Sequence, residues 1–260
     1  MELAYCSYFD APFTESTLDF MMKHSDKDWD WKYISSSPNI TMNMVEKYID
    51  KPWDWSGISQ NPNLTSEMIV KYPNKSWSWY CISETNLITI DLLTKLPNHP
   101  WDWECISGNL KLTIEILNKF ADKPWDWFGI SSNPSLTMKM IDTYPDKPWD
   151  WFEISRNSNL SISMKMIDKH LDKLWNWQYL SLNSNISMGI IDKYSNKPWN
   201  WNHISFHKKL SIQLVEKYID KPWNWKTNSQ HPKLTMEIIE RHPNKPWDWN
   251  NLPKHIFANS

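Results

Sequence analysis

The amino-acid sequence predicts an all-α protein, a right-handed α-solenoid of ten short helix-turn-helix repeats of 24 residues with terminal caps. The doublet Trp-x-Trp occurs ten times and contains all 20 tryptophans. Its copies are 24 residues apart, except for one step of 26 residues between Trp149 and Trp175. Between the doublets, apolar residues recur at helical spacing. A fixed period of this length is typical of arrays in which each unit is stabilised by its neighbours.

The first 15 residues do not fit the period, and their aromatic residues suit a cap over one end of the array. We therefore expect an N-terminal cap over residues 1–15, ten repeats over residues 16–253, and a C-terminal cap or tail over residues 254–260. The last repeats depart from the pattern, because Asn228 stands where the others have Ile or Leu and Pro253 replaces a serine. The two extra residues before Trp175 fall within residues 156–161, which we expect to be a loop.

Each repeat opens with an aliphatic residue followed by Thr or Ser, whose hydroxyl is typical of a helix N-cap. These residues are Thr17, Thr41, Thr65, Thr89, Thr113, Thr137, Ser163, Ser187, Ser211 and Thr235. Apolar residues then follow at helical spacing, which predicts a first helix of two turns. On its outer face an acidic residue often precedes a basic one by four, and we expect i,i+4 ion pairs there. They are Asp19 with Lys23, Glu67 with Lys71, Asp91 with Lys95, Glu115 with Lys119, and Glu237 with Arg241.

A turn of the form Pro-Asp-Lys-Pro ends the first helix, as at residues 145–148. Proline is tolerated in the first turn of a helix, so we expect Pro148 to open a second helix over residues 148–155. The Asp or Asn between the two tryptophans then lies in the first turn and caps it. The Ile-Ser and Asn-Pro that follow predict the helix end and a turn.

Other repeat folds fit less well. A leucine-rich repeat has a similar length, but its Leu-x-x-Leu-x-Leu pattern is absent and proline would interrupt the strand. A β-helix or propeller would show alternating apolar residues and more than the four glycines present.

The net charge of -2 gives no general attraction to nucleic acid or to an anionic membrane. The sequence also lacks an apolar run long enough for a membrane span, and its N-terminus lacks the pattern of a signal peptide. We therefore expect no membrane partner, and the charge disfavours nucleic acid as a partner. Three cysteines, Cys6, Cys81 and Cys105, do not make a disulfide framework, and the last two occupy equivalent positions in stacked repeats, which are too far apart for a disulfide. We therefore expect all three to be reduced.

The tandem motif of an aliphatic-Thr start, Lys-Pro-Trp-Asp-Trp, Ile-Ser and Asn-Pro resembles the Trp-Asp-Trp repeat proteins of giant DNA viruses of amoebae, the mimivirus relatives. The resemblance covers residues 16 to about 253. It implies a viral protein located in the host cytoplasm or the virion, and it supplies no catalytic residue, since that family has no assigned activity.

A doublet at constant phase in every repeat indicates core residues, because exposing 20 indoles would promote aggregation. A binding surface is expected instead at positions that differ between repeats. The most variable position is three residues after the first Trp, and its central members are Tyr80, Glu104, Phe128 and Phe152. If exposed, these four would form an apolar stripe with polar ends, as in a protein interface. The alternative is that they fill gaps between repeats.

Glycine loops for phosphate, metal-ligand spacings and a catalytic constellation are not apparent, so we expect no enzyme, cofactor or metal site. The favoured hypothesis is a non-enzymatic scaffold that binds a viral or host protein. The alternatives are a helical-repeat RNA-binding protein, which strong salt dependence would reveal, and a structural virion component.

Overall fold

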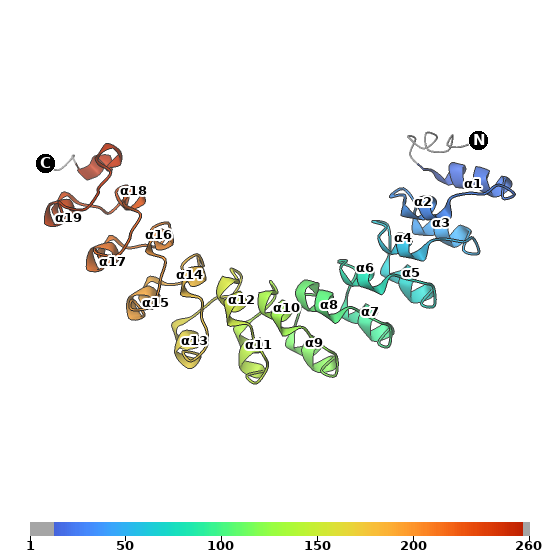
Figure 1. Ribbon diagram of the computed structural model, residues 1–260, viewed down its shortest axis with the longest axis horizontal. Helices are drawn as coiled ribbons and strands as arrows, with labels where there is room; N and C mark the ends of the chain where they lie inside the picture. Colours follow the sequence, from blue (N-terminus) through green and yellow to red (C-terminus); the bar gives the residue numbers. More distant parts are fainter. Residues whose placement is uncertain (1–12, 257–260) are drawn as a thin grey trace. The chain divides into compact units, whose positions relative to one another are not determined.

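The computed structural model describes residues 13–256, which form 19 short α-helices and two 3-10 helices without a strand (Figure 1). Each repeat contributes a first and a second helix, so the predicted array of helix pairs is confirmed. None of the described helices has the length and apolar character needed to cross a membrane. The right-handed winding stays a prediction.

The odd-numbered helices are the first helices of the repeats. They are α1 (Glu15–Lys23), α3 (Met42–Lys47), α5 (Ser66–Lys71), α7 (Ile90–Lys95), α9 (Ile114–Lys119), α11 (Met138–Thr143), α13 (Met164–Lys169), α15 (Met188–Lys193), α17 (Ile212–Lys217) and α19 (Met236–Arg241). The even-numbered helices are the second helices. They are α2 (Trp31–Ser36), α4 (Trp55–Ser59), α6 (Trp79–Ser83), α8 (Trp103–Asn109), α10 (Trp127–Ser132), α12 (Trp151–Arg156), α14 (Trp177–Leu180), α16 (Trp201–Ile204) and α18 (Trp225–Asn228). In the tenth repeat a 3-10 helix, η1 (Trp249–Asn251), takes this place, and η2 (Lys254–Ile256) follows.

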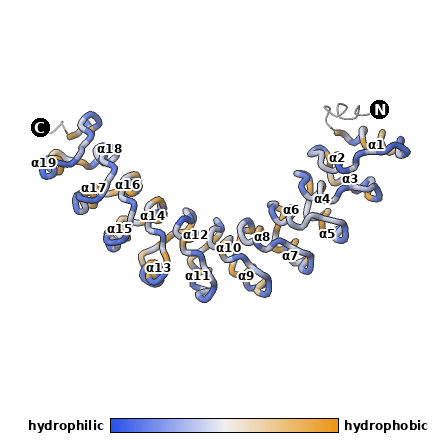
Figure 2. The backbone as a smooth tube through the Cα atoms, in the orientation of Figure 1, coloured by the Kyte–Doolittle hydropathy of each residue, from blue (hydrophilic) through white to orange (hydrophobic). Residues whose placement is uncertain are grey.

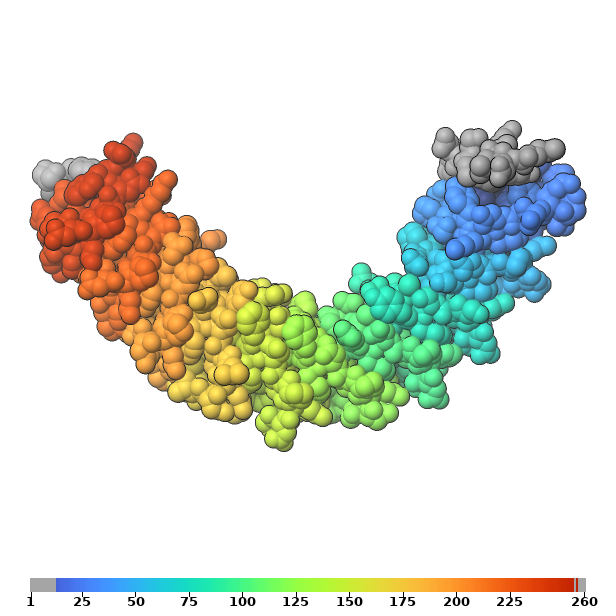
Figure 3. Space-filling view, in the orientation of Figure 1, coloured from blue at the N-terminus to red at the C-terminus, as the bar shows by residue number. Residues whose placement is uncertain are grey.

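The chain divides into two compact units. The first comprises the described residues up to Leu110 together with Glu115–Asp126, and the second comprises Lys111–Ile114 and the described residues from Trp127 onward. In the first unit α2, α4, α6 and α8 pack in sequence, and in the second unit α10, α12 and α14 do so. Apolar segments alternate with hydrophilic turns along each unit (Figure 2), and within a unit consecutive repeats form a continuous packed surface (Figure 3).

The hydroxyl caps of the first helices follow the prediction in eight repeats. The hydroxyl accepts from the backbone N–H three residues later at 3.2–3.4 Å. The prediction is wrong for Thr17, because α1 begins earlier, at Glu15, and Thr14 is its N-cap. Thr17 instead completes a capping box with Thr14.

The second helix begins later than predicted. Pro148 and Trp149 precede the helix, Asp150 is its N-cap, and Trp151 is its first residue. The Trp149 N–H donates to the Lys147 carbonyl at 2.8 Å, which closes a three-residue turn around Pro148. The intervening Asp or Asn does cap the helix, one position outside it, where the side chain accepts from a helical N–H. Asp248 in the tenth repeat is the exception, because its side chain makes no cap hydrogen bond.

The two tryptophans of a doublet have different partners. The indole of the first donates to the backbone carbonyl five residues earlier, at the C-terminal end of its own first helix, in all ten repeats at 2.8–3.0 Å. The second Trp packs edge-on against the first Trp of the next repeat, with ring centroids 4.7–5.0 Å apart in nine pairs. Trp249, in the last repeat, has no such neighbour and is 61% exposed. The prediction of core residues is therefore confirmed for the doublets as a class, with Trp249 as the exception.

A buried serine joins each repeat to the next. The serine six residues after the first Trp accepts from the backbone N–H of the capping Asp, Asn or Ser in the following repeat, at 2.8–3.0 Å in nine of nine junctions. The hydroxyl also donates within its own helix, as from Ser155 to the Trp151 carbonyl at 2.6 Å. The sequence predicted only a helix end at this serine.

The predicted i,i+4 ion pairs are mostly replaced by pairs between successive first helices. Asp91 and Lys95 do pair at 2.8 Å. Lys71, however, binds Glu46 of the preceding repeat rather than Glu67, also at 2.8 Å, and Asp19 is bound by Lys47 of the following repeat rather than by Lys23. Arg241 likewise binds Glu216. The reason is geometric, since adjacent first helices place these side chains within reach of each other across the repeat junction.

The terminal caps are described only in part. Residues 1–12 and 257–260 of the predicted caps lie outside the described residues. Phe13 and Ile256, at the two ends of the described chain, are buried. Cys81 and Cys105 are free thiols, as predicted, and Cys6 lies outside the described residues.

Candidate protein interface

The variable position three residues after the first Trp is the second residue of each second helix. Because the capping residue fixes where the helix begins, this position falls at the same place on the helix in every repeat, and all ten copies are exposed. Tyr80 is 56% exposed, Phe128 57% and Phe152 43%, and Glu104 is exposed as well. The condition attached to the predicted interface, that this position faces solvent, is therefore met.

Two of the aromatic side chains have neighbours on this surface. The Tyr80 hydroxyl donates to Glu84 Oε1 at 2.8 Å, one turn later on the same face of α6, and this bond raises the pKa of Tyr80 to about 12. The Phe152 ring lies edge-on to Tyr179 of the next repeat, with centroids 4.9 Å apart. These contacts hold the rings over the second-helix surface, and each ring remains largely accessible.

The four predicted residues are divided between the two units, two in each. Tyr80 and Glu104 lie on α6 and α8 of the first unit, and Phe128 and Phe152 lie on α10 and α12 of the second. The continuous stripe of four residues therefore stays a prediction, whereas the exposure of each member is a property of its own unit.

Two exposed apolar residues on the second-helix side were not predicted. Leu182 and Phe206 are 55% and 61% exposed and occupy the same place in consecutive repeats of the second unit, seven residues after the first Trp. This position also varies between repeats, and it lies four residues after the predicted one, where a helix brings side chains to the same face. Extending the comparison between repeats to this second position would have found them.

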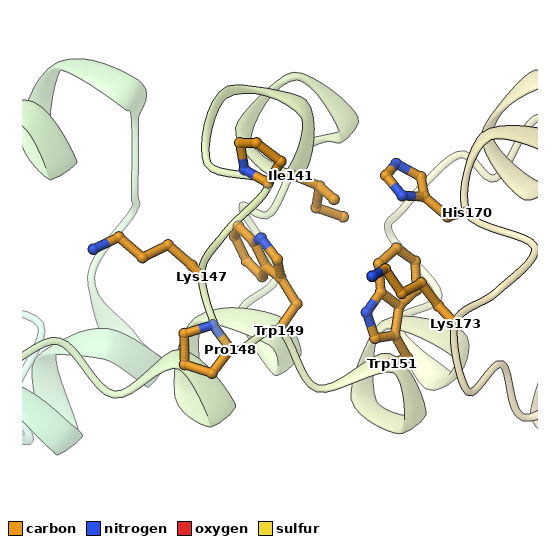
Figure 4. A pocket seen from close by; sticks show the side chains of 8 residues that line it. Ile141, Lys147, Pro148, Trp149, Trp151, His170 and Lys173 are labelled. Atoms are coloured by element: carbon orange, nitrogen blue, oxygen red, sulfur yellow. The ribbon is translucent and has the colours of Figure 1, made fainter.

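A small pocket in the second unit lies between the turn of one repeat and the first helix of the next (Figure 4). Its volume is about 200 Å³, and Trp149, Trp151, His170 and the lysines Lys147 and Lys173 line it. The Lys147 ammonium lies over the ring of Trp127, 5.3 Å from its centroid. These residues pack the junction between repeats.

Residues suited to chemistry are dispersed. Among residues 13–256, His, Cys, Asp and Glu form no group of three that could hold a metal ion. His207 Nε2 lies 2.8 Å from the Ser181 carbonyl. Burial and the neighbouring Asp102 raise the pKa of the Cys105 thiol to about 11, so the thiol is protonated near neutral pH.

Comparison of the chain with protein-family models, curated protein sequences and solved structures finds no match. The resemblance of the repeat motif to the Trp-Asp-Trp proteins of giant viruses therefore stays a prediction.

Proposed function

We propose that this chain is a non-enzymatic repeat scaffold that binds another protein, a viral or host factor, through the exposed face of its second helices. The observation that supports this proposal is the contrast between two sets of positions. The doublet tryptophans are the same in every repeat and pack the junctions, whereas the position three residues after the first Trp differs between repeats and is exposed in all ten. Packing does not determine which residue stands at this position, so selection for binding is free to determine it.

The residues found there in the central repeats suit a protein partner. Aromatic side chains are enriched among the residues that contribute most to protein interfaces, because they cover a large area with few rotatable bonds. Tyr80, Phe128 and Phe152 are each at least 43% exposed. Polar residues occupy the same position toward both ends of the array, for example Lys32 and Asn250. An apolar centre with a polar surround is the usual composition of an interface.

The test compares the wild-type chain with the triple variant Tyr80→Ala/Phe128→Ala/Phe152→Ala in affinity capture from lysate of infected host cells. Circular dichroism first establishes that both chains are helical. We expect a protein captured by the wild type to be lost by the triple variant. Each interface aromatic typically contributes about 1–2 kcal/mol or more, so binding measured with the purified partner should weaken at least tenfold.

The matched control is Phe20→Ala/Leu171→Ala/Leu174→Ala, which removes three exposed apolar side chains from the first helices and their turns. This control should retain the partner. Equal retention by both triple variants would contradict the proposed face. Capture of RNA that weakens steeply with salt would favour the RNA-binding alternative, and abundance of the chain in purified particles would favour a structural virion component.

A further inference from the structure

The ninth repeat contains a buried polar side chain that has no hydrogen-bond partner. Asn228 occupies the core position of α18, where the other nine repeats have Ile or Leu. It is only 1% exposed, and neither its side-chain nitrogen nor its side-chain oxygen makes a hydrogen bond. Buried polar groups are nearly always paired, because an unpaired group loses its bonds to water without replacement. An unpaired buried amide of this kind suggests that a ligand supplies the missing hydrogen-bond partner.

Asn228 lines a groove of about 520 Å³ in the second unit. The groove is formed by the loop after α16, over residues 205–211, and by the end of α18 with the loop after it, over residues 227–233. The volume lies within the range of about 300–1,000 Å³ that is usual for ligand sites. Asn228 lies in the wall of this groove and its amide is covered in the free chain, so a ligand in the groove reaches the amide when the wall opens.

The groove has a positive charge that is not compensated. Its lining contains Lys208, Lys209 and Lys233 and no acidic residue. All three lysines are exposed, and none forms an ion pair with another residue of the described range 13–256. Elsewhere in this unit the lysines at the ends of α13, α15 and α17 each bind an aspartate of the preceding repeat. The groove thus offers cations to an acidic ligand.

We propose that this groove binds an acidic peptide segment, with Asn228 pairing with the peptide main chain and the three lysines contacting its carboxylates. The unmade bonds of Asn228 include donors and an acceptor, and a peptide group supplies both a C=O and an N–H. Single-stranded nucleic acid fits less well, because its binding sites stack bases on aromatic rings. No Trp, Tyr or Phe lines the groove.

The inference rests on the proposed function only in naming protein as the class of partner. The groove and the aromatic positions share no residue, so either can be wrong alone. The variant Tyr80→Ala/Phe128→Ala/Phe152→Ala should bind an acidic peptide as the wild type does, which separates failure of this inference from failure of the proposed interface.

The experiment measures fluorescence anisotropy of a labelled decapeptide of alternating Glu and Ala on addition of the full chain, at near-physiological salt. We expect saturable binding that Lys208→Gln/Lys209→Gln/Lys233→Gln weakens at least tenfold at unchanged Tm. The matched control is Lys111→Gln/Lys139→Gln/Lys165→Gln, which removes three exposed and unpaired lysines of the same unit and should leave binding unchanged.

Asn228→Leu tests the buried amide separately. This substitution restores the residue class of the other repeats, so the variant should have a higher Tm than the wild type and bind the peptide at least tenfold more weakly. Wild-type affinity in either the Asn228 variant or the groove lysine variant would overturn the proposal. Equal binding of the Gln-Ala decapeptide, or preferential binding of a ten-nucleotide uridylate RNA, would also overturn it, the latter in favour of nucleic acid.

Discussion

At the scale of single residues, the serine six positions after the first Trp of a repeat links that repeat to the next. Ser155 is fully buried. Its hydroxyl accepts a hydrogen bond from the Asn176 N–H at 2.9 Å and donates one to the Trp151 carbonyl at 2.6 Å. The same hydrogen bond from a backbone N–H to the serine hydroxyl occurs at nine junctions, including the one that carries the two-residue insertion. A serine is suited to this place because it is small enough for the core and can donate and accept at once.

Ser155→Ala should destabilise the chain by about 1–3 kcal/mol, because the Asn176 N–H loses its partner in a site with little access to water. Urea unfolding followed by tryptophan fluorescence checks this as a lower midpoint. Ser161→Ala is the control, since Ser161 is exposed, and its effect should stay within about 0.5 kcal/mol. Equal midpoints for the two variants would show that the junction hydrogen bond contributes nothing.

At the scale of helices, short elements depend on their ends and on their neighbours. Most first helices have six residues and the second helices four to seven, which is too short for stability in isolation. A hydroxyl, carboxylate or amide oxygen caps the start of most of these helices, and an indole N–H binds the carbonyl at the end of each first helix. The edge-on tryptophan pairs then join each second helix to the next repeat.

Thr137→Ala removes the N-cap of α11 and should cost about 1 kcal/mol, because the Met140 N–H loses its acceptor. Thr137→Ser should remain close to wild type, since Ser163 and Ser187 cap α13 and α15 in the same way. Thermal unfolding by circular dichroism distinguishes the variants. A similar loss in both would mean that the methyl group, rather than the hydroxyl, matters.

The edge-on pair of Trp151 and Trp175 should show coupling in a double-mutant cycle. With both residues changed to Leu singly and together, we expect a coupling free energy of about 0.5–1.5 kcal/mol, the usual value for aromatic pairs in this geometry. The comparison cycle pairs Trp151 with Trp223, which packs on Trp201 instead, and its effects should add. Additivity in the first cycle would argue against a specific ring contact.

At the scale of the whole molecule, ion pairs connect successive first helices within both units. Hydrogen bonds from Lys47, Lys193 and Lys217 lower the pKa values of Asp19, Asp168 and Asp192, and in each case a tyrosine hydroxyl adds to the effect. These groups are exposed, so each contact alone is weak and sensitive to salt. Their repetition gives the array a stability that depends on pH.

A carboxyl group whose pKa is lower in the folded chain stabilises it above the ordinary carboxyl pKa, and this contribution is lost as pH falls through the folded-state pKa. We therefore expect Asp168→Asn/Asp192→Asn to have a lower Tm than the wild type at pH 7, with a difference that shrinks steadily below about pH 4. Differential scanning calorimetry between pH 7 and pH 2 measures it. Asp28→Asn/Asp146→Asn, which removes exposed carboxylates without ion pairs, should show no such trend. A constant difference down to pH 2 would refute this account.

The sequence by itself determined the features that depend on neighbouring residues. The period, the helix pairs, the Thr and Ser caps and the capping Asp or Asn follow from local chemistry, which repeats with the chain. Comparing repeats identified the variable position, and the structure decided that its side chains are exposed rather than filling gaps between repeats. The start of the second helix was misjudged because Pro148 satisfies a three-residue turn as well as a first helical turn.

Only the tertiary structure decided the contacts made across a repeat junction. The serine acceptors, the tryptophan pairs and the ion pairs of Lys71 and Arg241 join residues about 19 to 26 positions apart, and their existence depends on how one backbone rests on the next. The departure at Asn228 was visible in the sequence as a loss of pattern. That it lines a lysine-rich groove with its bonds unmade became apparent only when two loops were brought together in space.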